Sequence, residues 1–114
     1  LALGTPNHEF PENTLINPGQ AVVVFGGGTP TGNFGGAQVF TSSNQVLNLN
    51  NQGDFMTMTD SSGNVFIEFD ITPLSNNPNE SYTRDPDLSG DFTQHNTVSG
   101  TLFSPGTKTD GTPF

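Results

Sequence analysis

The chain has 114 residues, 30% of them hydrophobic, and its 11 acidic residues outnumber two basic ones, so its formal net charge is −9. Such a surface repels nucleic-acid phosphates and anionic membrane surfaces, so neither is an expected partner. There is no cysteine, which excludes disulfides, thiolate metal sites and a cysteine nucleophile. No apolar stretch approaches the length that crosses a bilayer, so membrane insertion is not expected.

The chain length fits one domain with one core, which we predict to span residues 1–114. Thr, Asn, Gly, Ser and Pro dominate the sequence, and these residues favour strands and turns. Ten Phe and one Tyr are spread along the chain; their large buried areas compensate for the small number of aliphatic residues and favour a folded chain over a disordered one. The low lysine content and the acidity are typical of prokaryotic exported surface proteins, so we expect an extracellular or cell-surface location.

Turn signals recur about every eight to twelve residues, a spacing typical of a β-sandwich or barrel. Residues 9–16, around Pro11, are predicted to form an edge or entry strand, because proline cannot donate a ladder hydrogen bond. Residues 20–25 form an apolar run without alternation, which predicts a central strand buried on both faces. Shorter strands are predicted at 37–41 and 45–49.

The clearest hairpin joins residues 55–59 to residues 65–71. The period of two predicts one apolar face on the second strand, formed by Val65, Ile67, Phe69 and Ile71. Glu68 and Asp70 are expected to face water, and Phe66, on the side of Glu68, is expected to be exposed or at an interface. The loop 60–64 supplies a residue that tolerates positive φ. Two further short strands are predicted at 81–83 and 98–103.

Several segments, taken together and in order, resemble the lamin-tail domain family, and most closely its bacterial branch, whose members are appended to exported and surface proteins. The matching segments are residues 17–28 (NPGQAVVVFGGG), 47–54 (LNLNNQGD), 59–65 (TDSSGNV), 81–87 (SYTRDPD), 90–92 (GDF), His95, 104–107 (SPGT) and 110–114 (DGTPF). They span nearly the whole chain. The resemblance implies an all-β fold, an immunoglobulin-like antiparallel β-sandwich.

The chain departs from that family at its beginning, because the family's first strands have no counterpart and Leu1-Ala2-Leu3 is at best the stub of one. A sandwich without those strands exposes an edge, which strand addition from a neighbour would cover. We therefore expect a non-catalytic structural or assembly module, a homo-oligomer or a filament subunit whose partner is itself. The alternative is an accessory domain of an exported enzyme or surface protein that binds a glycan or another surface protein.

Catalysis is not expected, because the two histidines, His8 and His95, stand beside no recognisable nucleophile motif. Residues 85–91 have oxygen-bearing side chains at alternate positions and glycine at the sixth, like the start of a calcium loop. The candidate ligands are Asp85, Asp87, Ser89 and Asp91. Position twelve of that pattern is Asn96 rather than Glu, so the favoured interpretation is a loop bonded to its own backbone, with Ca²⁺ as the alternative. No other cofactor is expected.

Arg84 is the single arginine of the chain. We predict a structural role, a charge-assisted pair with Asp85, Asp87 or Asp91 that fixes the following loop. His95 is predicted to hydrogen-bond the same loop.

Overall fold

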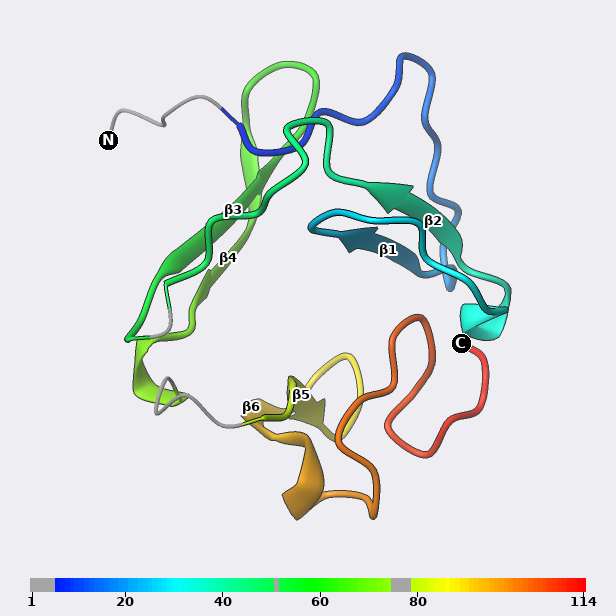
Figure 1. Ribbon diagram of the computed structural model, residues 1–114, viewed down its shortest axis with the longest axis vertical. Coiled ribbons are helices and arrows are strands. Elements are labelled where there is room, and N and C mark those ends of the chain that lie inside the picture. The colour runs from blue at the N-terminus through cyan, green and yellow to red at the C-terminus, as the bar shows by residue number, and fades with distance from the viewer. Residues whose placement is uncertain (1–5, 51, 75–78) are drawn as a thin grey trace. The chain divides into compact units, whose positions relative to one another are not determined.

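The computed structural model describes residues 6–50, 52–74 and 79–114 and is built mostly of short strands (Figure 1). Its elements are β1 (Val22–Phe25), η1 (Phe34–Gly36), β2 (Gln38–Thr41), β3 (Phe55–Thr59), β4 (Val65–Asp70), η2 (Thr72–Leu74), β5 (Tyr82–Asp85), β6 (Asp91–Gln94) and η3 (His95–Thr97), where η marks a single 3₁₀ turn. The chain divides into two compact units, Leu1–Asn48 with Phe103–Phe114, and Leu49–Leu102. The prediction of an all-β class is therefore confirmed, and the strands pair in twos.

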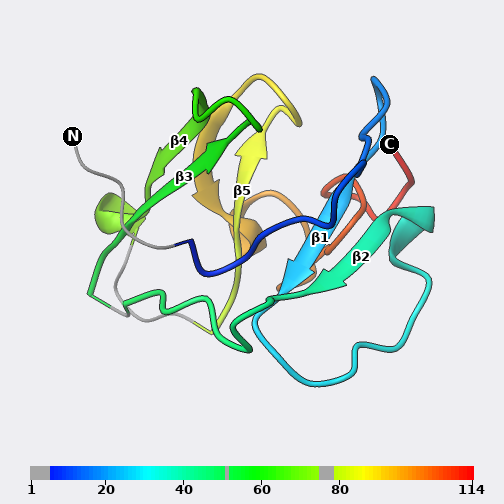
Figure 2. The ribbon, with the colours of Figure 1, turned by 90° about the horizontal axis from the view of Figure 1, so that it is seen from above.

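In the first unit, β1 and β2 pair in parallel, with Val22 opposite Gln38 and Phe25 opposite Thr41; their arrows run the same way in Figure 2. All four residues of β1 are half-buried. Within the described residues β1 has β2 as its one neighbour, so the prediction of a central strand buried on both faces is wrong. A valine run lacks alternation, and such a run gives no information about how many neighbours its strand has.

In the second unit, β3 and β4 form the predicted antiparallel hairpin. Gly63 takes φ +86° in its loop, which is the left-handed conformation that the sequence anticipated. Met56 lies opposite Phe69 and Met58 opposite Ile67. These four residues share one side of the ribbon, because directly opposed residues of an antiparallel pair point the same way; we call them the apolar face. Thr57 lies opposite Glu68 on the other side, and a register shift follows between Met58 and Thr59.

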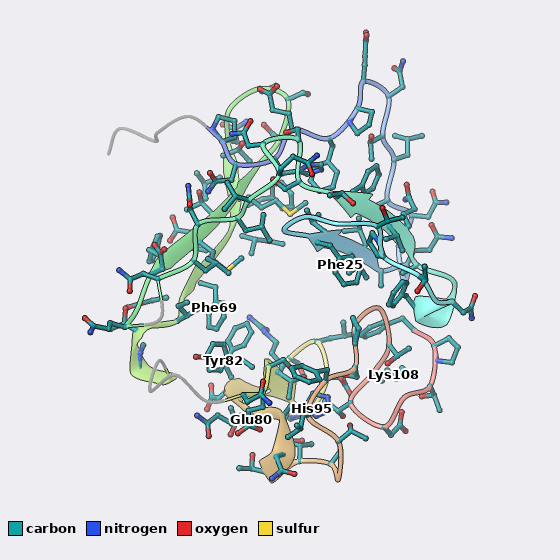
Figure 3. The ribbon with its side chains drawn as sticks, viewed as in Figure 1. Phe25, Phe69, Glu80, Tyr82, His95 and Lys108 are labelled. Atoms are coloured by element: carbon teal, nitrogen blue, oxygen red, sulfur yellow. The ribbon has the colours of Figure 1, made fainter. Side chains whose placement is uncertain are left out.

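The second hairpin of this unit pairs β5 with β6, from Tyr82 opposite Gln94 to Asp85 opposite Asp91. Only its first strand was predicted. The aromatic ring of Phe92, on β6, stacks on that of Phe69, on β4, with centroids 3.7 Å apart. Tyr82 meets the same ring edge-on at 6.5 Å, and Figure 3 shows Phe69 and Tyr82 directed toward one another. Aromatic contact thus joins the two hairpins.

Three predicted strands are absent. Residues 45–49 cannot extend, because Gln45 (φ +61°) and Asn48 (φ +56°) take left-handed conformations. Residues 9–16 form a turn in which Thr14 N–H donates to the Pro11 carbonyl. Residues 98–103 wrap around His95, whose carbonyl accepts the Val98 and Ser99 N–H groups. In each segment a local turn bonds part of the backbone that a strand would have paired, as when the Gln45 N–H donates to the Ser42 carbonyl.

Very little apolar surface is buried. Ile71, 5% exposed, is the buried hydrophobic residue among the described ones. Fourteen large apolar side chains in the described ranges are at least 37% exposed, and they include Leu15, Val39, Phe55, Met56, Phe66, Ile67, Leu88, Phe103 and Phe114. A two-stranded sheet has no second layer to cover its faces, and isolated two-stranded sheets are marginally stable at best.

Candidate assembly surfaces

The apolar face of the β3–β4 ribbon is only partly covered. Phe69 and Met58 are half-buried, Phe69 under Phe92 and Tyr82. Met56, directly opposite Phe69, is 39% exposed, and Ile67, opposite Met58, is 50% exposed. Because the ribbon is a sheet of two strands, its backbone edges also have no third strand among the described residues. An uncovered apolar face beside an open edge is the arrangement that strand addition requires.

The opposite side of the ribbon, which we call the mixed face, has a different chemistry. It carries Phe55, Thr57, Phe66, Glu68 and Asp70. Phe66 is 57% exposed, as expected from its place beside Glu68, and Phe55 is 50% exposed. Exposed aromatic rings can stack on a sugar ring, and neighbouring carboxylates can accept hydrogen bonds from its hydroxyl groups.

The loop between β3 and β4 is held by the Asp60 carboxylate. Its Oδ1 accepts the N–H groups of Ser62 and Asn64, each at 2.9 Å. The bond from the Asn64 backbone is the largest cause that lowers the pKa of Asp60 below its ordinary value of 3.8. Hydrogen bonds from Thr72 lower the pKa of Asp70 in the same way, and those from Thr112 lower the pKa of Asp110. Each of these three acidic side chains thus holds a turn.

These lowered pKa values predict acid sensitivity. A carboxyl group whose pKa is lower in the folded than in the unfolded chain stabilises the fold above the unfolded value, and loses that contribution as the pH falls through the folded value. We expect the urea midpoint to fall as the pH drops below the ordinary carboxyl value of 3.8 and through the lower values of the folded chain. Asp60→Asn keeps an acceptor oxygen but carries no charge, so the urea midpoint of this variant should decrease less as the pH falls. An identical pH profile in both proteins would contradict the contribution assigned to Asp60.

Arg84 does fix the loop after it, but not through a carboxylate. Its Nη1 donates to the Leu88 carbonyl at 2.9 Å, and its guanidinium carbon lies 4.8 Å from the centre of the Phe92 ring. These are the partners of Arg84 among the described residues, so the predicted ion pair is wrong. Leu88 turns back with φ +72°, which brings its carbonyl within reach, and the ring of Phe92 supports the planar guanidinium.

The four candidate calcium ligands lie on and around the β5–β6 loop. Asp85 and Asp91 face each other across the strands, and Asp87 and Ser89 belong to the loop, which closes through the Gly90 N–H and the Pro86 carbonyl at 2.8 Å. Within residues 6–50, 52–74 and 79–114, no three His, Asp or Glu side chains gather as metal ligands would. The bond between Gly90 and Pro86 is one bond of this loop to its own backbone.

His95 is 1% exposed and fixes a different loop from the one predicted. Its Nδ1 lies 2.8 Å from the Thr101 carbonyl and 3.3 Å from Ser99 Oγ, while its backbone N–H donates to the Ser81 carbonyl at 2.9 Å. The ring thus holds residues 99–101 rather than the loop after Arg84. Nothing in the sequence distinguished these two loops, because both lie within a few residues of His95.

A shallow cavity of about 170 Å³ lies in the first unit, lined by Gln20, Gly35, Gln38, Gly106 and other uncharged residues. Pockets for small organic ligands are usually about 300 Å³ or larger. Its lining side chains include no acid, base or nucleophile of the kind that a catalytic site needs.

Comparison of the chain with protein-family models, with curated proteins and with solved structures gave no match. In the part of the chain that the structure describes, no helix is long and apolar enough to span a membrane. The lamin-tail resemblance therefore remains a prediction from the residues, and Leu1-Ala2-Leu3 lies outside the described residues.

Proposed function

We propose that this chain is a non-catalytic assembly module that associates with copies of itself at the surface of a prokaryotic cell, as a homo-oligomer or filament subunit. The β3–β4 ribbon is the observation that carries the proposal, because Met56 and Ile67 stand uncovered on its apolar face. Burying that face against a neighbour would supply the second layer that the ribbon lacks. Its open edges would add main-chain hydrogen bonds.

The immunoglobulin-like sandwich of the lamin-tail family belongs to the same proposal. Two antiparallel hairpins, β3–β4 and β5–β6, packed through Phe69 and Phe92, support it. The parallel pairing of β1 with β2 is the feature that a wholly antiparallel sandwich would not contain. We infer that completed sheets form when copies associate.

The net charge sets the conditions for association. Two chains that each carry −9 repel one another, and salt screens that repulsion. The Debye length falls from about 30 Å at 0.01 M to about 8 Å at 0.15 M ionic strength. We therefore expect the assembled fraction to rise over this range, as followed by light scattering coupled to size-exclusion chromatography and by negative-stain imaging.

A substitution on the apolar face tests the same proposal. Ile67→Glu adds a charge where the neighbour would pack, and should give monomers whose circular dichroism matches that of the unchanged protein. Phe66→Ala, on the mixed face, is the control and should assemble normally. An unchanged protein that remains monomeric at every concentration and ionic strength, and unfolds cooperatively, would overturn the proposal.

The second candidate function is that of an accessory module that binds a glycan. The exposed rings of Phe55 and Phe66, beside Glu68 and Asp70 on the mixed face, favour it. Here the effects of the two variants reverse: Phe66→Ala should abolish retention on a polysaccharide affinity gel, whereas Ile67→Glu should leave retention intact.

A further inference from the structure

Residues 6–10 lie along the turn formed by residues 42–47, far from them in the sequence (Figure 1). We call residues 6–10 the strap and residues 42–47 the receptor turn; both belong to the first unit. Six hydrogen bonds join them: Ser42 Oγ to the Asn7 carbonyl (2.5 Å), Asn44 N–H to the Asn7 carbonyl (3.3 Å), Asn7 Nδ2 to the Leu47 carbonyl (2.9 Å), Ser43 N–H to His8 Nδ1 (3.1 Å), Glu9 N–H to Ser43 Oγ (3.0 Å) and Asn44 Nδ2 to the Pro6 carbonyl (3.1 Å).

Ser42 and Asn7 form the centre of this contact. Ser42 is fully buried, and its hydroxyl lies within 2.8 Å of the Val46 carbonyl as well as beside that of Asn7. A hydroxyl has one proton for these two acceptors, so the same group shapes the receptor turn and binds the strap. Asn7 accepts a hydrogen bond with its carbonyl and donates one with its side-chain amide. The receptor turn is therefore complementary to this particular segment.

One polar atom in this contact, on the ring of His8, has no hydrogen-bond partner among the described residues. The His8 ring packs against Phe10 and Phe40, with centroids 4.6 Å and 5.8 Å away. Because Nδ1 accepts the Ser43 N–H, the ring proton of the neutral form belongs on Nε2. That atom is buried and has no hydrogen-bond partner among the described residues. A buried polar group without a partner costs free energy, so the strap is bound specifically but with less than its full stabilisation.

The segment that follows the strap is exposed. Every residue from 11 to 20 is exposed except Thr14, which is half-buried. Its contacts are mostly internal, such as Gln20 N–H to the Asn17 carbonyl, with one bond from Gln38 Nε2 to the Leu15 carbonyl. Ten residues reach about 35 Å when extended. The strap can therefore leave its own receptor turn and reach that of a neighbouring copy.

We propose that the strap is exchanged between copies, so that residues 6–10 of one chain occupy residues 42–47 of a second. This inference rests on the proposed self-association and names the segment that joins the copies. The exchanged state keeps the six bonds and the ring cluster, so the bonding gained in one chain equals the bonding lost in the other. The balance then depends on concentration and on the conformation of residues 11–20.

Complementation tests the exchange. Asn7→Ala removes the strap's side-chain bond to the Leu47 carbonyl, and Ser42→Ala removes the hydroxyl that bonds the Asn7 carbonyl. We expect either loss to release the strap, in the monomer and in the exchanged dimer alike, so each variant alone should dimerise at least tenfold more weakly than the unchanged chain. In an equimolar mixture, the intact strap of the Ser42→Ala chain can bind the intact turn of the Asn7→Ala chain. Native mass spectrometry should then show heterodimers at least tenfold above the level of either homodimer.

The matched control mixes Asn7→Ala with His8→Ala, two damaged straps that cannot rescue each other. A Ser42→Ala mixture that dimerises no more than this control overturns the exchange. If the unchanged protein still assembles in that case, the proposed function stands and its join lies elsewhere. If the unchanged protein never assembles, the proposed function itself fails.

A shortened linker gives a second measurement that needs no damaged contact. Deleting residues 12–16 should prevent the strap from folding back onto its own turn while leaving it able to reach another copy. The deletion variant should therefore be dimeric at micromolar concentration. A folded, monomeric deletion variant would also overturn the exchange.

Discussion

Replacement of Gly90 by alanine is expected to unfold the β5–β6 hairpin. A Cβ atom at this position would overlap the carbonyl carbon and oxygen of Asp85 and the backbone nitrogen of Pro86. Those atoms belong to the backbone and cannot turn aside as a flexible side chain could. We expect a loss of about 3 kcal/mol or more in the free energy of unfolding, at the upper end of the usual cost of overpacking.

Gly100→Ala is the matched control, because a Cβ atom there meets nothing within 4 Å. It adds the same methyl group to the same unit and should change the free energy of unfolding by no more than about 0.5 kcal/mol. Urea titration measures both variants, and the near-ultraviolet circular dichroism of Tyr82, the single tyrosine of the chain, reports on β5 itself. Equal stability of the two variants would show that the loop 86–90 can take another path.

Replacement of Ile71 by alanine should have the second large effect. Ile71 is 5% exposed, and its N–H donates to the Asp54 carbonyl at 2.9 Å, which extends the β3–β4 ladder by one pair. Truncation of a buried isoleucine removes apolar contacts and leaves a cavity, at a cost of about 2–5 kcal/mol. For a chain that buries so few apolar side chains, that is a large share of the usual stability of about 5–15 kcal/mol.

Ile16→Ala deletes the same atoms from a side chain that is 42% exposed. Its cost should stay within about 0.5 kcal/mol. Thermal and urea unfolding of both variants, measured at a concentration where each is monomeric, give the comparison. If the two substitutions lower the free energy of unfolding equally, Ile71 is not at the centre of a hydrophobic core.

Local patterns predicted the elements that depend on neighbours in sequence. Alternation at residues 65–71 gave the hairpin and the exposed Phe66, and the turn residues around Gly63 gave its loop. Residues 45–49 also alternate, but Gln45 and Asn48 take left-handed conformations that periodicity cannot detect. β6 was not predicted, because a four-residue strand with one apolar ring, Phe92, shows too little alternation to be recognised.

The partners of side chains were harder to predict than the strands. Arg84 was expected to pair with a carboxylate because three lie close in sequence, yet its Nη1 donates to the Leu88 carbonyl at 2.9 Å. The parallel register of β1 and β2 depends on a crossover whose path the run of valines does not encode. The strap was missed because its bonds join residues more than 30 positions apart, which no local pattern records.

The two compact units also fix an order of events during synthesis. The first unit consists of Leu1–Asn48 and Phe103–Phe114, so the second, Leu49–Leu102, is an insertion within it. Gly35 of the first unit packs closely against Gly106, a contact that cannot form until the ribosome has made both segments. The inserted unit can therefore fold while the first unit is still incomplete. The loop closure that brings residues 103–114 to the rest of the first unit comes afterwards. Until then, the surface of residues 34–36 remains open to other chains.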